Sequence, residues 1–261
     1  MIVHTEGIVL RVSPFSRTSH VVTWLTPDRG RVTALVKGAI RPKSLFLGQY
    51  DLFYTCDVLF YFRDKTGVHL VRECAPLNSR ATLRDDWRAA FTASALCACV
   101  AGVIPPGDHH PSGLYGLLST GLDALTACLP ALTVLHWFEL MLLDELGLRP
   151  QMTLCSRCGR DCTGPEEVAM VPASGGIVCR PCQKIRHAAS ATATPIRPDA
   201  LGILRHWQGC ADPHAAARVV CTACQVSDTG SALNAFLRYH IDSPSVSRAI
   251  AIAARLDGDP A

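Results

Sequence analysis

The feature that most constrains the fold of this chain is a pair of cysteine doublets in its second half. Cys155-Ser-Arg-Cys158 is followed, after 20 intervening residues, by Cys179-Arg-Pro-Cys182. Each doublet can place two thiolates on one metal ion from a tight turn, and the second doublet can complete a tetrahedron. The segment around them is rich in Gly and Pro and has little apolar periodicity, so a metal has to replace a hydrophobic core. We therefore predict one structural Zn²⁺, bound by Cys155, Cys158, Cys179 and Cys182.

A site of four thiolates leaves no open position for water, so this zinc is not expected to catalyse a reaction. Zinc nucleobase deaminases also use paired cysteines, but they require His-x-Glu and Pro-Cys-x-x-Cys signatures. Here His136-Trp-Phe-Glu139 has one residue too many, and Pro181 lies inside the second doublet. The sequence also lacks a phosphate loop, a dinucleotide-binding glycine pattern and a nucleophile elbow. We expect a binding protein and not an enzyme.

The other cysteines have less specific patterns. Cys162 could compete as a zinc ligand, although a surface thiol beside the site is the simpler interpretation. Cys221-Thr-Ala-Cys224 could form a second site with Cys210, but the helical context favours small buried residues at this spacing. Five further cysteines lie in apolar runs and are expected in the core: Cys56, Cys74, Cys97, Cys99 and Cys128.

Composition and charge restrict the class of protein. A hydrophobic content of 49% with 18% charged residues describes a globular chain of one or two domains. The first residues do not resemble a secretory signal, and the apolar run 89–104 is shorter than the ~20 residues of a membrane span. We therefore expect reduced thiols, a cytoplasmic location and no membrane partner. Residues 1–80 carry eleven Lys and Arg against six Asp and Glu, which favours a polyanionic partner for this part.

The first 80 residues have the pattern of a small β-barrel. Apolar, β-branched and aromatic runs separated by short turns predict five strands, at 8–12, 20–25, 31–36, 48–62 and 68–74. Five strands without a helical pattern in about 75 residues are typical of an OB-type barrel.

After residue 80 apolar residues recur at helical spacing. The predicted helices are 85–102, 112–128, 130–146, 198–207, 215–241 with a break near 227–230, and more weakly 245–256. The small-residue stretch 188–195 is expected to be a connector. The fold class is therefore α+β and multidomain: a barrel at 1–80, a helical domain at 81–150 and 188–261, and a zinc module at 151–187.

A basic segment, residues 37–44, follows the third predicted strand directly. Lys37, Arg41 and Lys43 place three cations within seven residues at the mouth of the barrel, where they can reach phosphates. The alternative is a solvated loop that only keeps the protein soluble. Arg11, Arg17, Arg29 and Arg31 lie near strand ends and could extend the track. The nearby aromatic residues serve either the core or base stacking, and the sequence does not sort them: Phe15, Trp24, Phe46, Tyr50, Phe53 and Tyr54.

Several stretches together resemble the RecO family of bacterial recombination mediators. They are residues 6–10, 23–31, 37–44, 138–148, 155–159 and 175–182. The resemblance covers about residues 1–185 and implies an OB barrel, a helical domain and a zinc module in a non-enzymatic protein of recombinational repair. Lys37, Arg41 and Lys43 of this chain match the family's basic loop, and the resemblance implies that they contact DNA. Some members of the family lack the four cysteines.

The resemblance also implies partners. Members bind single- and double-stranded DNA, anneal complementary strands, partner RecR, and contact the C-terminal tail of the single-stranded-DNA-binding protein to help load RecA on gaps. A nucleoid-associated location would follow. The competing hypothesis is a zinc-containing protein-interaction adaptor that makes no direct contact with DNA.

Overall fold

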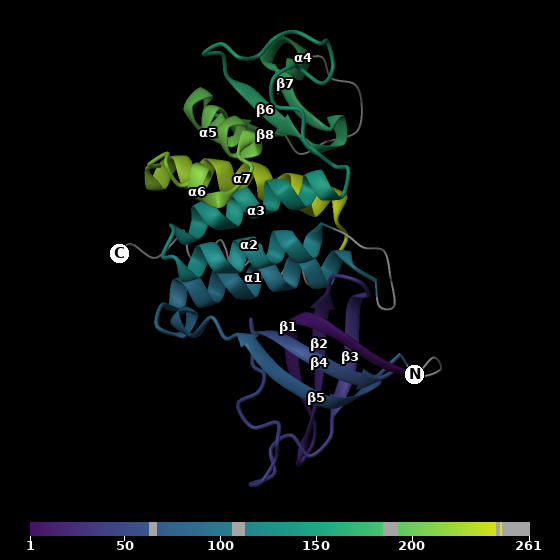
Figure 1. Cartoon of the computed structure of the whole chain (residues 1–261). Helices are drawn as coiled ribbons and strands as arrows, with labels where there is room; N and C mark the ends of the chain where they lie inside the picture. Colours follow the sequence, from purple (N-terminus) through teal and green to yellow (C-terminus); the bar gives the residue numbers. More distant parts are fainter. Residues whose placement is uncertain (63–66, 106–112, 185–192, 244–245, 247–261) are drawn as a thin grey trace. The chain divides into compact units, whose positions relative to one another are not determined.

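A computed structural model describes residues 1–62, 67–105, 113–184, 193–243 and 246 (Figure 1). The chain divides into two compact units, Met1–Thr126 and Ala127–Ala261. This division falls inside segment 81–150, which the sequence pattern treats as one helical part. Within the described residues, the helices are all too short or too polar to cross a membrane.

The first unit begins with a closed five-stranded barrel in the order β1-β2-β3-β5-β4 (Figure 1). Its strands are β1 (Ile2–Ser16), β2 (Ser19–Thr26), β3 (Gly30–Val36), β4 (Thr55–Tyr61) and β5 (His69–Asn78). Neighbouring strands are antiparallel except β3 and β5, which run parallel. The predicted five-stranded barrel is confirmed.

Alternation along the strands fills the barrel. In β3 the side chains of Val32, Ala34 and Val36 are buried, because every second residue of a strand faces the same side. Trp24 occupies this core, and a Cβ at Gly7 would lie 3.0 Å from the Cβ of Trp24. Glycine at that position therefore lets the indole approach the backbone of β1.

The fourth strand starts later than predicted. Residues 48–54, expected to be extended, belong to the long loop 37–54 that joins β3 to β4. Phe53 has a left-handed backbone with φ of 70°, which interrupts a strand. The loop nevertheless binds the barrel, since the N–H of Phe53 donates to Val9 O and the N–H of Val9 donates to Tyr54 O.

Two helices complete the first unit. The short 3₁₀ helix η1 (Ala81–Arg84) leads into α1 (Trp87–Val103), whose N-terminus is capped by Asp86, and α2 (Leu114–Thr126) packs against α1. The predicted helices over 85–102 and 112–128 are thus confirmed within one or two residues at each described end.

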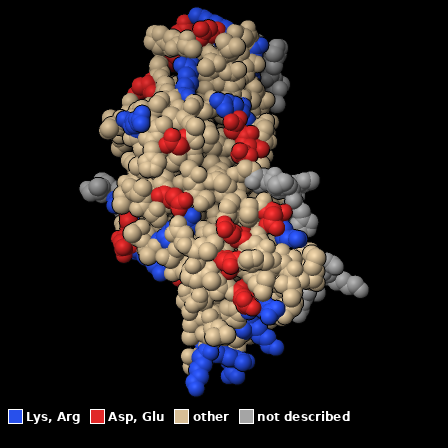
Figure 2. Space-filling view, in the orientation of Figure 1, with Lys and Arg blue, Asp and Glu red and all other residues tan. Residues whose placement is uncertain are grey.

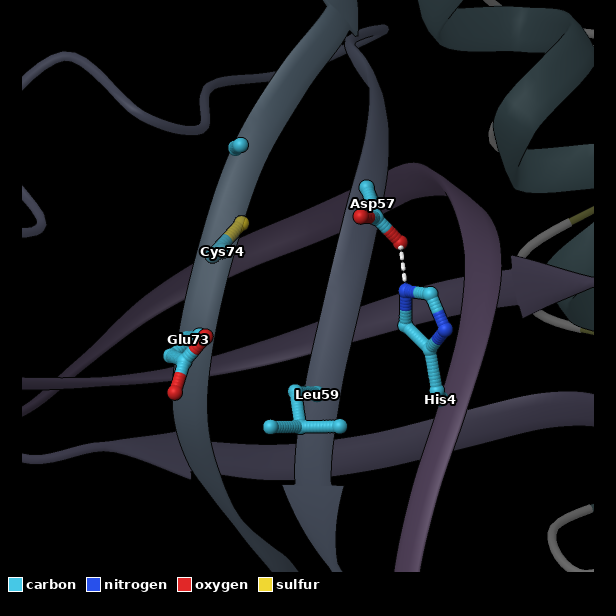
Figure 3. Close-up of a pocket in the computed structure, with 6 residues that line it drawn as sticks. His4, Asp57, Leu59, Glu73 and Cys74 are labelled. Carbon is cyan, nitrogen blue, oxygen red and sulfur yellow. Dashed lines mark ion pairs between the residues drawn. The ribbon is translucent and has the colours of Figure 1, made fainter.

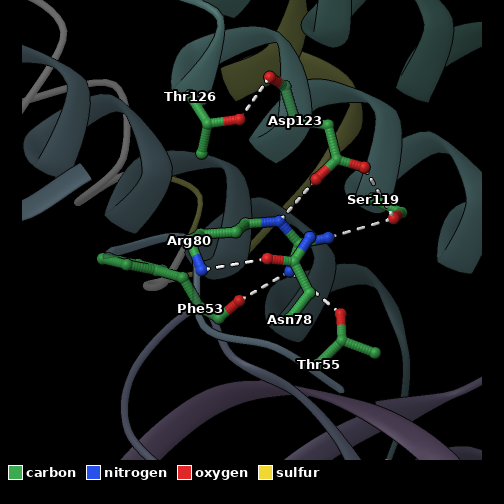
Figure 4. A network of polar contacts seen from close by, with 7 residues as sticks. All are labelled: Phe53, Thr55, Asn78, Arg80, Ser119, Asp123 and Thr126. Carbon is green, nitrogen blue, oxygen red and sulfur yellow. Dashed lines mark hydrogen bonds and ion pairs between the residues drawn. The ribbon is translucent and has the colours of Figure 1, made fainter. Parts of the chain in front are cut away.

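A buried arginine joins the barrel to α2. The side chain of Arg80 is 2% exposed, and its guanidinium donates to Phe53 O at 2.7 Å, Thr55 Oγ1 at 2.9 Å and Asp123 Oδ1 at 2.7 Å (Figure 4). A fourth bond reaches Ser119 Oγ at 3.1 Å. One side chain thus binds loop 37–54, β4 and α2, because the rigid guanidinium offers five donors.

The second unit consists of helices and a small three-stranded sheet of order β7-β6-β8. Its helices are α3 (Ala131–Glu145), α4 (Arg180–Lys184), α5 (Pro198–Gly209), α6 (Pro213–Ala216) and α7 (Ala223–His240). Its strands are β6 (Val168–Val171), β7 (Gly176–Cys179) and β8 (Thr194–Ile196), with a 3₁₀ turn η2 (Pro172–Ser174). The sheet was not predicted, because strands of three or four residues give too short a pattern to recognise.

The expected break near 227–230 is wrong. Helix α7 runs through this stretch, and Thr229 and Gly230 are buried on its packed face. The break lies earlier, at Thr222, which caps the N-terminus of α7. The Thr222 hydroxyl oxygen accepts a hydrogen bond from the Gln225 N–H, and the Gln225 side-chain oxygen accepts one from the Thr222 N–H. Most of the expected connector 188–195 and nearly all of 245–256 lie outside the described residues.

Candidate metal centre and nucleic-acid interface

The four cysteines of the two doublets meet at one point of the second unit. The sulfur atoms of Cys155, Cys158, Cys179 and Cys182 all lie within 4.8 Å of one another, and those of Cys158 and Cys179 are 3.7 Å apart. Zinc–sulfur bonds of about 2.3 Å in a regular tetrahedron give sulfur–sulfur edges of about 3.8 Å. The donor set and its spacing therefore fit a tetrahedral metal site. Among the residues described, no other group of three potential ligands comes together.

Two tight turns position these sulfurs. The N–H of Gly159 donates to Cys155 O and the N–H of Cys155 donates to Arg160 O, both within 2.9 Å. Gly159 has φ of 72°, a conformation that glycine adopts without strain. In the second doublet Cys179 ends β7 and Cys182 lies in α4. Arg157 Nη1 bonds Cys182 O at 3.1 Å, which ties the first turn to the second.

The protonation of the metal-free thiols differs within the group. Burial acts to raise the pKa of Cys155, but hydrogen bonds from backbone N–H groups, that of Cys179 among them, outweigh it and lower this pKa to about 6. Hydrogen bonds with the thiols of Cys158 and Cys179 raise the pKa of Cys182 to about 12. A metal ion would therefore compete with bound protons, and its affinity would rise with pH.

The remaining cysteines do not join the site. Cys162 is buried and its Sγ contacts Arg160 O at 3.5 Å, so the expected surface thiol is wrong. Cys210 is buried, Cys221 precedes α7 and Cys224 is exposed on it, so the expected packing of that doublet in a core is also wrong. The predicted burial of the five further cysteines is confirmed for four of them, Cys56, Cys74, Cys97 and Cys99. It is wrong for Cys128, which is exposed.

The predicted basic residues gather at one end of the barrel. Lys37, Arg41 and Lys43 are exposed in loop 37–54, and Arg17 is exposed in the turn between β1 and β2. Two hydrogen bonds hold that loop to this turn, from Gly38 N to Ser19 Oγ at 3.1 Å and from Ile40 N to Thr18 O at 3.3 Å.

We call Arg17, Lys37, Arg41 and Lys43 the basic end. Figure 2 shows Lys and Arg side chains clustered at the tip of the barrel. Within the described part of the chain, none of the four forms an ion pair, although ten other such pairs are present there. Unpaired, exposed cations are available to neutralise the phosphates of a nucleic acid.

Arg11 and Arg31 lie away from the basic end. Arg11 is exposed in the middle of β1, opposite Thr23. Arg31 is the second residue of β3, and six residue steps along the strand, about 20 Å, lead from it to Lys37. Its Nη1 donates to Ala101 O in the last turn of α1, and burial lowers the pKa of Arg31. The geometry gives Arg31 a structural role at a helix C-terminus, which is an alternative to its expected contact with DNA.

The structure also sorts the aromatic residues that the sequence left open. Trp24 and Phe53 are buried, and Phe46, Tyr50 and Tyr54 pack against the barrel core. Phe15 differs from these five, because 65% of its surface is exposed.

Sequence reasoning missed a pocket of about 460 Å³ on the outer face of the barrel (Figure 3). His4 Nε2 and Asp57 Oδ1 form an ion pair of 2.5 Å there, and Glu73 adds a second carboxylate. Two acids beside one histidine do not suit a phosphate group. The lining residues come from three strands, so no local motif marks them.

His136 and Glu139 do not extend the metal centre. They are neighbours on α3, both about 1% exposed, and their side chains pair at 2.9 Å. Partnered with each other in the interior, they form a buried pair and not the signature of a deaminase.

Comparison with known proteins agrees with this architecture. The family model "Recombination protein O N terminal" matches residues 1–80, and "Recombination protein O C terminal" matches residues 84–249. The DNA repair protein RecO of Moorella thermoacetica is 35% identical over 179 residues, covering 68% of this chain and 65% of that protein. That of Heliobacterium modesticaldum is 32% identical over 209 residues, covering 77% and 71%.

The chain thus spans just under two thirds of the Moorella protein and somewhat more of the Heliobacterium one. The boundary between the two family models, at residues 80 and 84, coincides with the end of the barrel. Because the two models together match most of the sequence, this chain belongs to the RecO family.

Proposed function

We propose that this protein is a DNA-binding mediator of recombinational repair. The observation that carries the proposal is the basic end, four exposed cations without ion pairs in the described residues, brought together by loop 37–54 and the β1–β2 turn. They stand on the domain that matches the N-terminal family model. Cations in this arrangement bind phosphates without reading sequence.

This binding would assist annealing in a direct physical way. Two complementary strands repel each other through their phosphates, and a protein that neutralises some of them lowers that repulsion. Such a mechanism uses no nucleotide hydrolysis, so the protein acts as a binder and not as an enzyme. It works on single-stranded and double-stranded DNA at the nucleoid, in the cytoplasm.

The partners that we propose are those that the resemblance to the family implies. They are RecR, the C-terminal tail of the single-stranded-DNA-binding protein and, indirectly, RecA, which the protein helps to load on gaps. The larger matched part of the chain, residues 84–249, contains the helices and is the place to look for these contacts.

The metal we propose is a single structural Zn²⁺. Cys155, Cys158, Cys179 and Cys182 would hold it, because four thiolates in a tetrahedron suit zinc. When bound, it supplies a cross-link between two turns. Within the second unit, Arg205 of α5 donates to Met152 O at 2.7 Å and to Cys162 O at 2.6 Å, so α5 supports the cysteine segment.

The test is the salt dependence of DNA binding. Changing Lys37, Arg41 and Lys43 together to Ala should weaken binding to a labelled single-stranded oligonucleotide. It should also reduce the slope of log affinity against log salt by about 2, since each contact with a single strand contributes about 0.7. Fluorescence anisotropy at four salt concentrations measures both.

The control removes the same charge elsewhere, by changing Arg180, Arg218 and Arg238 to Ala; all three are exposed in the second unit. This variant should keep the slope of the unmodified protein. An unchanged slope in the first variant would overturn DNA binding by the basic end and favour the protein-interaction adaptor.

A further inference from the structure

Phe15 has an unusual place in the barrel. The pairing of β1 with β2 shifts register between Pro14, opposite His20, and Ser16, opposite Ser19. Phe15 is therefore the extra residue of a β-bulge at the tip of the hairpin. A bulge turns a side chain away from the direction that strand alternation would give it, and bulges are common beside functional sites.

The bulge directs Phe15 outward at the basic end. Its side chain is 65% exposed although it is among the largest apolar residues of the chain, and it stands two residues before Arg17. In loop 37–54, Leu45 is 90% exposed two residues after Lys43, while its neighbour Phe46 packs against the core. Exposed apolar side chains thus alternate with the cations of this end.

We propose that Phe15 contacts the unpaired bases of single-stranded DNA while the basic end holds its phosphates, with Leu45 as a second apolar contact. The inference rests on the proposed function and deepens it, since it gives particular side chains the task of distinguishing single strands from duplexes. In this arrangement the cations provide attraction to any strand, and Phe15 distinguishes an unpaired strand from a duplex.

The chemistry of the two ligands supports this division. A single strand exposes both its phosphates and the flat apolar faces of its bases, so neighbouring cations and an aromatic ring can bind it together. In a duplex the base faces are covered by stacking, and a protruding side chain reaches them only by opening a step. Loss of one stacking contact with a single strand weakens binding by about 5- to 150-fold.

Charge complementarity selects nucleic acid over a protein as the occupant. Arg17 lies two residues after Phe15 and Lys43 two residues before Leu45, and hydrogen bonds at Gly38 and Ile40 hold their two segments together. The cations of the basic end form no ion pairs in the described residues, which suits a polyanion with apolar faces. An anionic lipid surface shares part of that chemistry, and the experiment separates it from DNA.

The experiment compares Phe15→Ala with the unmodified protein on three ligands of equal length: a thymine single strand, an abasic strand with the same phosphates, and a duplex. The variant should bind the thymine strand at least about fivefold more weakly. Its affinity for the abasic strand and the duplex, and its salt slope, should not change. Leu45→Ala should show the same pattern to a smaller extent, and Phe15→Trp should restore binding.

Leu77→Ala is the matched control, because Leu77 is 55% exposed on β5 outside the basic end. Circular dichroism checks folding, which an exposed side chain should not affect. Unchanged binding of Phe15→Ala to the thymine strand would overturn the inference. If the triple Lys37, Arg41 and Lys43 variant still lost affinity, the proposed function would stand. Weakened binding of Phe15→Ala to phosphatidylglycerol vesicles, with DNA binding unaltered, would also overturn the inference that Phe15 contacts bases.

Discussion

The guanidinium of Arg80 donates a 2.7 Å hydrogen bond to the carbonyl oxygen of Phe53, and both residues have left-handed backbones, with φ of 43° and 70°. Each such conformation costs a non-glycine residue about 1–2 kcal/mol. The two strained residues lie 27 positions apart, yet one side chain stabilises both. Arg80 therefore fixes the inner part of the loop whose outer part carries the basic end.

Replacing Arg80 with Ala should lower the free energy of unfolding by about 3 kcal/mol, since hydrogen bonds to charged groups contribute about 1.5–3 kcal/mol each and buried acceptors would lose their donor. Arg80→Lys should recover little of this, because an ammonium does not reproduce the planar fork. Urea unfolding measures the change. The control is Arg84→Ala, since Arg84 pairs with Asp51 at the surface and its loss should cost at most about 1 kcal/mol. Equal losses in both variants would contradict the role of Arg80.

Arg31→Gln should separate structural from DNA-binding cations. The variant loses the hydrogen bond to Ala101 O at the end of α1 and should be less stable by about 1–2 kcal/mol. Its salt slope for DNA should equal that of the unmodified protein, because Arg31 lies far along β3 from Lys37. A reduced slope, measured by the anisotropy assay, would instead return Arg31 to the DNA-binding track.

The cysteines can be distinguished by metal content. Cys155→Ser should reduce bound zinc and thermal stability together, because metal binding and local folding are coupled. Cys162→Ser should retain one zinc per chain, since Cys162 lies outside the four-sulfur group. Atomic absorption on purified protein gives both values. One zinc retained in Cys155→Ser and lost only when Cys162 is also changed would identify Cys162 as a substitute ligand.

Gly176 tests how the cysteine segment is supported. A Cβ at this position would lie 2.2 Å from Gln151 O, which accepts a hydrogen bond from Ile177 N. Gly176→Ala should push residue 151 away and weaken zinc binding, measured by competition with a chromogenic chelator. Gly202→Ala in α5 is the control, because its Cβ would meet nothing within 4 Å and should stabilise the helix slightly. Equal zinc affinity in the two variants would argue against this contact.

Features recorded in local sequence could be predicted. Alternation in β3 and the short spacing of the doublets each need only a few neighbouring residues to be recognised. The break expected near 227–230 failed because Gly230 is buried by packing in α7, and packing outweighs its low helix propensity.

The features that escaped depend on distant parts of the chain. Nothing near Arg80 indicates that its partners are residues 53, 55, 119 and 123. The burial of Cys162 and the hydrogen bond from Arg31 to Ala101 O likewise come from tertiary structure. For the same reason the sequence pattern left six aromatic residues near the basic segment unsorted, and only their burial in the folded barrel shows that Phe15 is the exposed one.

The barrel wall is not equally strong around its circumference. β3 and β5 pair at two positions, Ala34 with His69 and Leu35 with Leu70, in the weaker parallel arrangement, whereas β1 and β4 pair at seven. We expect the barrel to open locally first between β3 and β5, so that the backbone amide hydrogens of this strand pair exchange with solvent fastest among those of the barrel strands. Lys37 directly follows β3 in the chain. The same opening would therefore let Lys37 shift to follow an irregular strand of DNA while Arg17 in the β1–β2 turn stays in place.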